Sequence, residues 1–332
     1  MTNSLLTLVF ISPFIFAVLL ANLAEQNKNL HVLQYVYLLL LNSFLFIAGL
    51  SSLGVGLLPK SIVSSSVGAA YQGINWPLMG IELMAGTGLA MLLLLPRVRQ
   101  LATHLFDIDG QSVVHATALS LTATALGLNL FQMNLNSVLL TPQGQQMIQK
   151  AGGETYLDIL IFPLLTLLVT ALFGVGWLTR RSWSDVVQRL GWTSPTLQQL
   201  ALGVGVVVVL LGLSFGTDWV WGRVDPVSRN QVGGVSNALL GNFSGVSGAF
   251  AIGITAAIGE ESFFRGAYLP RMGIFMSALL FASFHVQYFL SLATLLVFII
   301  GLILGVLRVR TTLAVCIMVH FLYNFASVLL GP

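Results

Sequence analysis

The sequence predicts an all-α integral membrane protein, a polytopic bundle of about ten spans whose chemistry lies near the C-terminus. Composition carries the first part of this prediction. Hydrophobic residues make up 56% of the 332 residues and charged residues only 8%, and the mean hydropathy is +0.91. Soluble domains contain about 25% charged residues. So few charges cannot cover a water-facing shell, so lipid must solvate most of the surface.

Ten apolar segments are long enough to span a bilayer, or nearly so, at about 20 residues each. The first segment lacks a positive n-region and a good cleavage site, so we expect a retained span and not a signal peptide. The eighth segment is the shortest. The segments cover residues 5–21, 33–57, 76–95, 113–130, 157–178, 200–220, 248–269, 274–284, 289–306 and 312–330.

Basic side chains predict the orientation of these segments. Connections after odd-numbered segments contain nine Lys and Arg side chains, whereas connections after even-numbered segments contain four. Because cytoplasmic loops are enriched in Lys and Arg, the odd connections should be cytoplasmic. Ten spans would then place both termini outside, and the seventh segment would run toward the cytoplasm. The four basic residues of the even connections are Lys60, Lys150, Arg223 and Arg229.

Two stretches divide the chain into regions. Residues 181–196 alternate apolar and polar side chains at helical spacing, which indicates an amphipathic linker on the cytoplasmic surface. Residues 222–247 are rich in Gly, Asn and Ser, and we expect a flexible external loop there. We therefore divide the chain into an N-terminal membrane region of unknown role, 1–180, the linker, and a C-terminal domain, 197–332. The single cysteine, Cys316, rules out an internal disulfide and a Cys-rich metal site.

The seventh segment carries an unusual cluster of charge. Glu260, Glu261 and Arg265 lie within six residues, between the apolar runs 248–258 and 274–284. A charge at this depth costs about 3 kcal/mol or more, so it usually marks a functional site. Glu261 and Arg265 are spaced i, i+4 in the favourable order for an ion pair. Glu260 points about 100° away around the helix and has no partner in its own helix.

Two further segments supply polar side chains that suit hydrolysis. Phe281 and His285 are spaced i, i+4 on the eighth segment, as are His320 and Asn324 on the tenth, so each pair shares a helix face. A carboxylate with an imidazole can hold and deprotonate a water molecule. A second imidazole and an amide can donate hydrogen bonds to an oxyanion.

These motifs resemble a known family. Glu260-Glu261-x-x-x-Arg265, Phe281-x-x-x-His285 and His320-x-x-x-Asn324 occur in the order found in the CAAX-processing and bacteriocin-processing endopeptidases, the CPBP or Abi family. The resemblance covers roughly residues 248–330 and leaves the first half unexplained. It implies a CPBP-like, CAAX-protease-like intramembrane endopeptidase that cuts a membrane-tethered peptide or protein.

The resemblance also implies a role for each residue. Glu260 would activate the attacking water, His285 would help to hold it, and His320 with Asn324 would stabilise the tetrahedral oxyanion. Glu261 and Arg265 would form the supporting ion pair. A metal is not strictly required. Glu260, His285 and His320 would suit a divalent metal such as zinc, and the sequence leaves both versions open.

Several alternatives remain. The cluster could lock helices in a non-catalytic membrane partner, such as an immunity or maturation factor, and a Glu-His relay could serve a proton-coupled carrier. Carriers usually contain internal repeats, and none is visible here. Cys316 lies four residues before His320, but a lone buried cysteine is usually small apolar filling. Glu82 is expected to pair across helices or to lie near the outer interface. The expected partners are the bilayer and a membrane-anchored substrate, and no nucleic acid.

Overall fold

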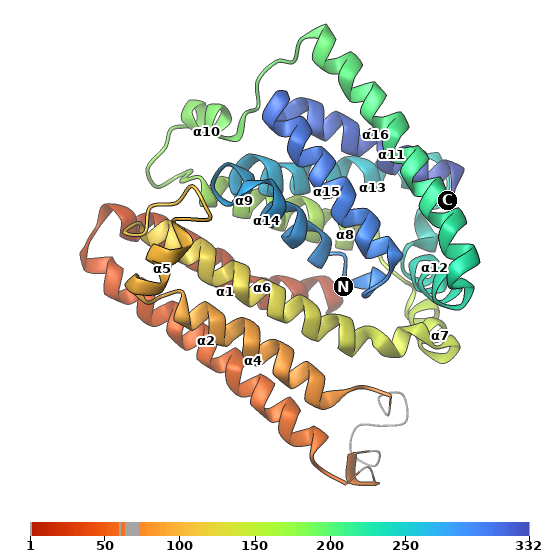
Figure 1. Ribbon diagram of the computed structural model, residues 1–332, viewed down its shortest axis with the longest axis horizontal. Coiled ribbons are helices and arrows are strands. Elements are labelled where there is room, and N and C mark those ends of the chain that lie inside the picture. The colour runs from red at the N-terminus through yellow and green to blue at the C-terminus, as the bar shows by residue number, and fades with distance from the viewer. Residues whose placement is uncertain (1, 60, 64–72, 332) are drawn as a thin grey trace.

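The structure is a computed structural model that describes residues 2–59, 61–63 and 73–331, with side chains from Leu8 onward. The described chain forms a helical bundle without strands (Figure 1). Lys60, one of the residues used to predict orientation, lies outside the described residues. The all-α fold class predicted from composition is confirmed.

The N-terminal half supplies one side of the bundle. In Figure 1, α2 and α4 lie side by side at its lower edge, and α6 and α1 lie between this pair and the C-terminal helices. The helices of this half are α1 (Thr2–Gln26), α2 (Asn29–Gly56), α4 (Trp76–Leu92), α5 (Pro96–Ala102), α6 (Val113–Leu135), η2 (Asn136–Leu140), α7 (Pro142–Ala151), α8 (Tyr156–Ile159), η3 (Leu160–Thr166) and α9 (Leu167–Gly174).

The C-terminal half packs over α6 and α9. α13 and α14 lie in the middle of the bundle, with α15, α16 and α11 outside them. The helices are α10 (Trp183–Leu190), α11 (Leu197–Val224), α12 (Pro226–Leu240), η4 (Gly241–Phe243), α13 (Val246–Glu260), η5 (Glu261–Tyr268), α14 (Leu269–Ser283), η6 (Val286–Tyr288), α15 (Leu292–Arg310) and α16 (Leu313–Leu330).

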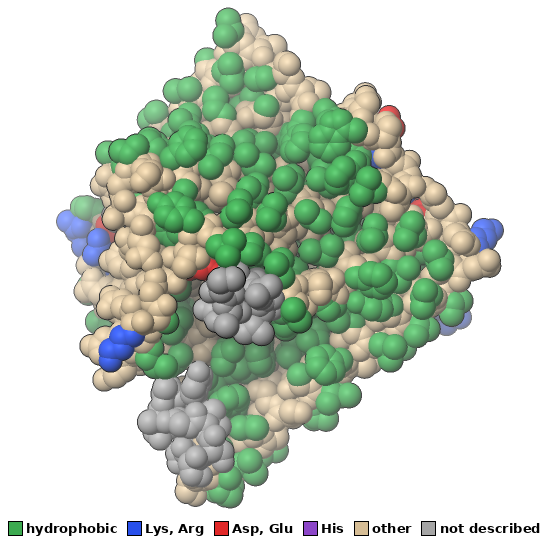
Figure 2. Space-filling model, turned by 180° about the vertical axis from the view of Figure 1, so that it is seen from behind, with side chains coloured by type: hydrophobic (Ala, Val, Ile, Leu, Met, Phe, Trp, Pro, Cys, Tyr) green, Lys and Arg blue, Asp and Glu red, His purple; other side chains and the backbone are tan. Residues whose placement is uncertain are grey.

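The described residues contain seven helices that are long and apolar enough to cross a membrane, or up to nine if each of two bent pairs counts as one span. The prediction of about ten spans is therefore approximate. Figure 2 shows the reason for the high hydropathy: hydrophobic side chains are spread over the face seen from behind, and Lys and Arg lie at its edges. A lipid environment satisfies such a surface.

The prediction of a flexible external loop at residues 222–247 is wrong in part, because α12 occupies most of this region. Asp225 caps this helix by accepting a hydrogen bond from the Ser228 backbone N–H, and proline stands at its first position. Val232 and Val235 are buried on its inner face. The Gly, Asn and Ser residues obscured an amphipathic helix, whose apolar positions find their partners only in the tertiary structure.

The predicted amphipathic helix is present as α10, and its apolar face meets protein. A capping box joins Ser182 and Asp185 at its start. Val186 and Leu190 are fully buried, in a cluster that includes Leu313. The helix is therefore fixed to the ends of η5 and α16, and the boundaries of the three regions stay a prediction.

Gly273 marks the break between the seventh and eighth predicted segments. Its φ of 74° and ψ of 172° lie in a region that side chains rarely adopt, so glycine allows the chain to turn there. The helix resumes at once and ends at Ser283. His285 consequently lies two residues beyond the helix that was expected to carry it, in the short connection to α15.

Candidate functional site

Two π-helices meet where the charged cluster begins. η5 starts at Glu261 and contains Arg265, and η3 contains Pro163. η3 packs directly on α13 at Gly259, where an added methyl group would lie 1.6 Å from the Pro163 carbonyl oxygen. Glycine is therefore required for this close approach of two backbones. π-helical turns are rare and are frequent at functional sites, and these two bring the N-terminal half against Glu260.

The ion pair predicted from spacing forms inside η5. Arg265 Nη1 donates to Glu261 Oε1 at 2.9 Å, and both side chains are fully buried. The guanidinium carbon of Arg265 also lies 4.2 Å from the centre of the Phe281 ring, a cation–π contact. This contact explains why a phenylalanine stands in the second motif.

Glu261 has a second partner that the sequence did not indicate. Its Oε1 lies 2.7 Å from Nδ1 of His320, which comes from α16 and is buried. Because Glu261 is the partner of Arg265 it is a carboxylate, so Nδ1–H of His320 donates to it. The bond fixes the ring and turns Nε2 toward Glu260. Glu261 therefore orients His320 as well as pairing with Arg265.

Glu260 faces the other way and lines a cavity. Its side chain is 14% exposed, and its Oε2 lies 3.9 Å from His320 Nε2, too far for a hydrogen bond. Oε2 is buried and has no hydrogen-bond partner among the described residues. An unpaired buried carboxylate oxygen is costly. Oε2 and Nε2 are too close for a water molecule to lie between them, and the exposed part of the Glu260 side chain lines the cavity.

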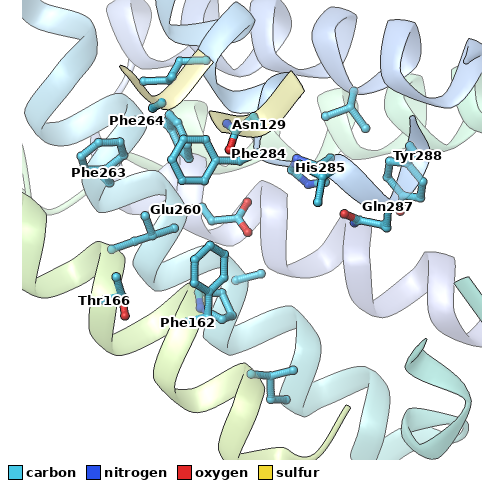
Figure 3. Close-up of a pocket in the computed structure, with 18 of the residues that line it drawn as sticks. Asn129, Phe162, Thr166, Glu260, Phe263, Phe264, Phe284, His285, Gln287 and Tyr288 are labelled. Carbon is cyan, nitrogen blue, oxygen red and sulfur yellow. The ribbon is translucent and has the colours of Figure 1, made fainter. Parts of the chain in front are cut away.

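His285 reaches the same cavity from the connection between α14 and α15. Its Nδ1 lies 3.0 Å from the carbonyl oxygen of Phe281, which can only accept, so Nδ1–H donates and Nε2 is left free. The Tyr288 ring stacks on it with 5.9 Å between centroids and 13° between planes. Figure 3 shows His285 beside the carboxylate of Glu260. Tyr288 was not identified from the sequence.

Asn324 lies one turn after His320 on α16 and lines the cavity with Glu260 and both imidazoles. Its amide forms no hydrogen bond to another described residue and can donate into the cavity. The structure thus brings together all six residues to which the resemblance gave a role. Glu260, His285, His320 and Asn324 line the cavity, and Glu261 and Arg265 lie buried behind it.

The cavity has a volume of about 2070 Å³ and extends well beyond these residues. Much of its wall comes from the N-terminal half, which the sequence left without a role. Phe162 and Thr166 of η3 and Asn129 of α6 lie around Glu260 (Figure 3). Asn129 also donates to Ser283 Oγ at 2.9 Å. Pro163 inside an apolar run was the one local sign of an irregular helix here.

The candidate metal ligands do not form a recognisable metal site here. No three His, Cys, Asp or Glu side chains cluster in a metal-binding arrangement within the residues that the structure describes. His320 Nδ1 and His285 Nδ1 are both engaged in hydrogen bonds, which leaves Nε2 of each ring free, as in histidines that bind metals. The geometry therefore leaves the zinc version open.

Two other polar side chains take structural positions. Cys316 is fully buried in an apolar cluster with Leu304 and Val319, and it does not line the cavity. Glu82 accepts hydrogen bonds from Asn134 at 2.9 and 2.7 Å, so it pairs across helices as expected. The geometry gives neither a part in the site.

Fold and site together define the class: an α-helical membrane protein with a Glu–His cluster in a cavity between its spanning helices. The family model described as type II CAAX prenyl endopeptidase Rce1-like matches residues 242–326. This region of the chain therefore belongs to the CPBP family, as the motifs indicated. The match contains all six predicted site residues and begins after the predicted domain boundary at 197. No curated protein and no solved structure matches the chain.

Proposed function

We propose that this protein is an intramembrane endopeptidase that hydrolyses a peptide bond of a membrane-tethered protein or peptide. The observation that carries the proposal is the unpaired Glu260 carboxylate, in a cavity shared with His285, His320 and Asn324. Glu261 also has one unpartnered oxygen, but it is fully buried and is bonded to Arg265 and His320, whereas Glu260 lines the cavity and accepts no hydrogen bond from a described residue. The family match supports the same reaction class.

Glu260 and His285 hold the attacking water. Glu260 accepts one hydrogen of the water, and the free Nε2 of His285 accepts the other. Nε2 of His285 is an acceptor because Nδ1–H donates to the Phe281 carbonyl, and the carboxylate form of Glu260 is an acceptor. As the water oxygen bonds to the scissile carbonyl carbon, its proton passes to Glu260 and the carbonyl electrons move onto oxygen.

His320 and Asn324 stabilise the resulting oxyanion. This role requires a proton on each ring nitrogen of His320. Nδ1–H donates to the Glu261 carboxylate, so Nε2–H can donate to the oxyanion, as can the Asn324 amide. When the intermediate collapses the C–N bond breaks, and Glu260 returns its proton to the amine nitrogen.

The substrate must enter the cavity as an extended chain. A helical peptide keeps its carbonyl oxygens in its own hydrogen bonds, which protects the scissile bond. The cavity also supplies the route for water, which lipid cannot provide. Basic side chains line one end of it, which supports an opening toward the cytoplasm.

Hydrolysis of a membrane-anchored peptide library by the purified protein tests this proposal. In water enriched with heavy oxygen, one heavy atom should appear in the new C-terminal carboxyl group, as mass spectrometry would detect. Glu260→Ala, His285→Ala and His320→Ala should each abolish cleavage while the protein still inserts. A chelator should leave the rate unchanged. A loss that added zinc reverses would replace this mechanism with a metal-dependent one.

A further inference from the structure

One end of the cavity that contains Glu260 is lined by arginines. Arg180 and Arg181 come from the connection between α9 and α10, Arg189 from α10, and Arg271 from the first turn of α14. Arg180, Arg181 and Arg189 lie within ten residues of one another, whereas Arg271 comes 82 positions after Arg189 and from a different helix. The fold therefore gathers them at the wall of a single space.

The positive charge at this end is not balanced. The acidic side chains that line the same part of the cavity are Glu25 and Asp109. Glu25 accepts a hydrogen bond from the Val114 backbone N–H, and Asp109 from that of Gln111. These bonds leave the charge of each carboxylate in place, so four guanidinium groups line this end of the cavity together with two carboxylates. Arg271 also pairs with Asp107 at 2.9 Å; the Asp107 side chain is 81% exposed and that of Arg271 is 43% exposed.

The arginines also repel one another. Burial is the main reason that the pKa of Arg189 is lowered to about 10, and the charges of four other arginines lower it as well: Arg271, Arg181, Arg308 and Arg180. Burial likewise lowers the pKa of Arg180. Nε of Arg180 is buried and has no hydrogen-bond partner within the described ranges. An anion placed among these groups would relieve the repulsion and satisfy this donor.

Membrane orientation alone does not explain the arrangement. Basic residues that only set topology can point outward, as Arg97 and Arg310 do: both are exposed, and neither lines the cavity. The four arginines instead line the cavity. One nitrogen of Arg181 donates to the Val175 carbonyl, one of Arg189 to the Gly266 carbonyl and one of Arg271 to Asp107, which leaves further N–H groups on each. A lipid head group would be expected on the outer surface of the bundle. A group inside the cavity is more naturally part of the peptide.

We propose that Arg180, Arg181, Arg189 and Arg271 form a subsite for a carboxylate of the peptide substrate, either its C-terminal carboxylate or an acidic side chain. The subsite rests on the proposed endopeptidase function, which it deepens by naming a substrate class. Guanidinium groups bind carboxylates through paired, charge-assisted hydrogen bonds. A peptide held there by its anionic group would extend along the cavity toward Glu260.

Peptide binding to full-length Glu260→Gln protein in phosphatidylcholine nanodiscs tests the subsite. Three synthetic pools share the same randomised neutral positions: one has a free C-terminal acid, one a C-terminal amide, and one an amide with a single Asp or Glu. Mass spectrometry quantifies the peptides retained. One of the two carboxylate pools should exceed the neutral amide pool by about tenfold, and the pool that does so identifies the source of the carboxylate.

Matched variants separate this subsite from general charge. Arg180→Gln with Arg271→Gln should bring the preferred pool to within about twofold of the neutral pool. Arg97→Gln with Arg310→Gln, which removes the same charge outside the cavity, should leave the preference intact. Arg180→Lys with Arg271→Lys should restore part of it. Continued protection of the buried Cys316 thiol from alkylation shows that each variant is folded.

Two outcomes would overturn the subsite. Equal retention of all three pools is one, and a preference that the cavity variants do not change is the other. Adding phosphatidylserine to the nanodiscs tests the lipid alternative: if serine phospholipid binds in an Arg180- and Arg271-dependent way and displaces the peptides, the site belongs to lipid. Arginine-dependent binding without any cleavage by the wild type would retain the subsite and reject the endopeptidase.

Discussion

Glu261→Gln should separate the structural and chemical parts of the site. Glu261 Oε1 accepts from Arg265 at 2.9 Å and from His320 at 2.7 Å, and both side chains of the ion pair are fully buried. Removing one partner of a fully buried ion pair costs about 3–5 kcal/mol. We therefore expect the unfolding midpoint to fall by roughly 5–10 °C and cleavage to be lost.

A second variant tells the two effects apart. Glu261→Gln with Arg265→Met removes both charges at similar volume, which is often nearly neutral for stability. Its unfolding midpoint should return close to that of the wild type. Cleavage should stay reduced, on the order of 10²-fold or more, because the His320 imidazolium lacks its carboxylate partner.

The single cysteine provides the unfolding assay. Cys316 is fully buried on α16, one turn before His320, so a thiol-reactive fluorophore reacts with it only when this helix opens. The midpoint of that reaction on heating gives the stability of each variant. If the double variant regains activity together with stability, Glu261 acts only through packing, and its assigned part in orienting His320 is wrong.

Two further predictions concern other parts of the fold. Gly259→Ala should lower stability by about 2 kcal/mol and impair cleavage, because the added methyl group meets the Pro163 carbonyl. Gly205→Ala, at a position on α11 with open space, should change neither stability nor cleavage. Equal effects of the two variants on Cys316 reactivity would contradict the argument. Burial raises the pKa of Glu154, and the nearby charge of Asp158 raises it further. The folded state therefore keeps this proton to higher pH than the unfolded chain does. Stability should fall as the pH rises from the unfolded pKa through the raised pKa of the folded state. Glu154→Gln should remove this decline in thermal midpoints measured across that range; an unchanged pH profile would count against it.

The sequence predicted the site more completely than its surroundings. Three short motifs placed Glu260, His285, His320 and Asn324 on separate segments, and the structure brings them to one cavity. Helical spacing also predicted the pairing of Glu261 with Arg265. Both signals are local, since a few residues and their period carry them.

The contacts that could not be predicted from the sequence are those between segments far apart along the chain. Glu261 and His320 are 59 positions apart, and no periodicity relates them. η3 closes the cavity through a backbone contact at Gly259, which depends on how two irregular helices pack. α12 was hidden for the same reason: Val232 and Val235 become a buried face only once neighbouring helices cover them.

The most direct test of the account is the turnover of Glu260→Gln protein on a peptide that the wild type cleaves. The substitution keeps the size of the side chain but removes the base. The account predicts that kcat falls about 10³-fold, while the heating midpoint reported by Cys316 does not decrease. Wild-type turnover in a folded Glu260→Gln variant would contradict the claim that this carboxylate activates the attacking water.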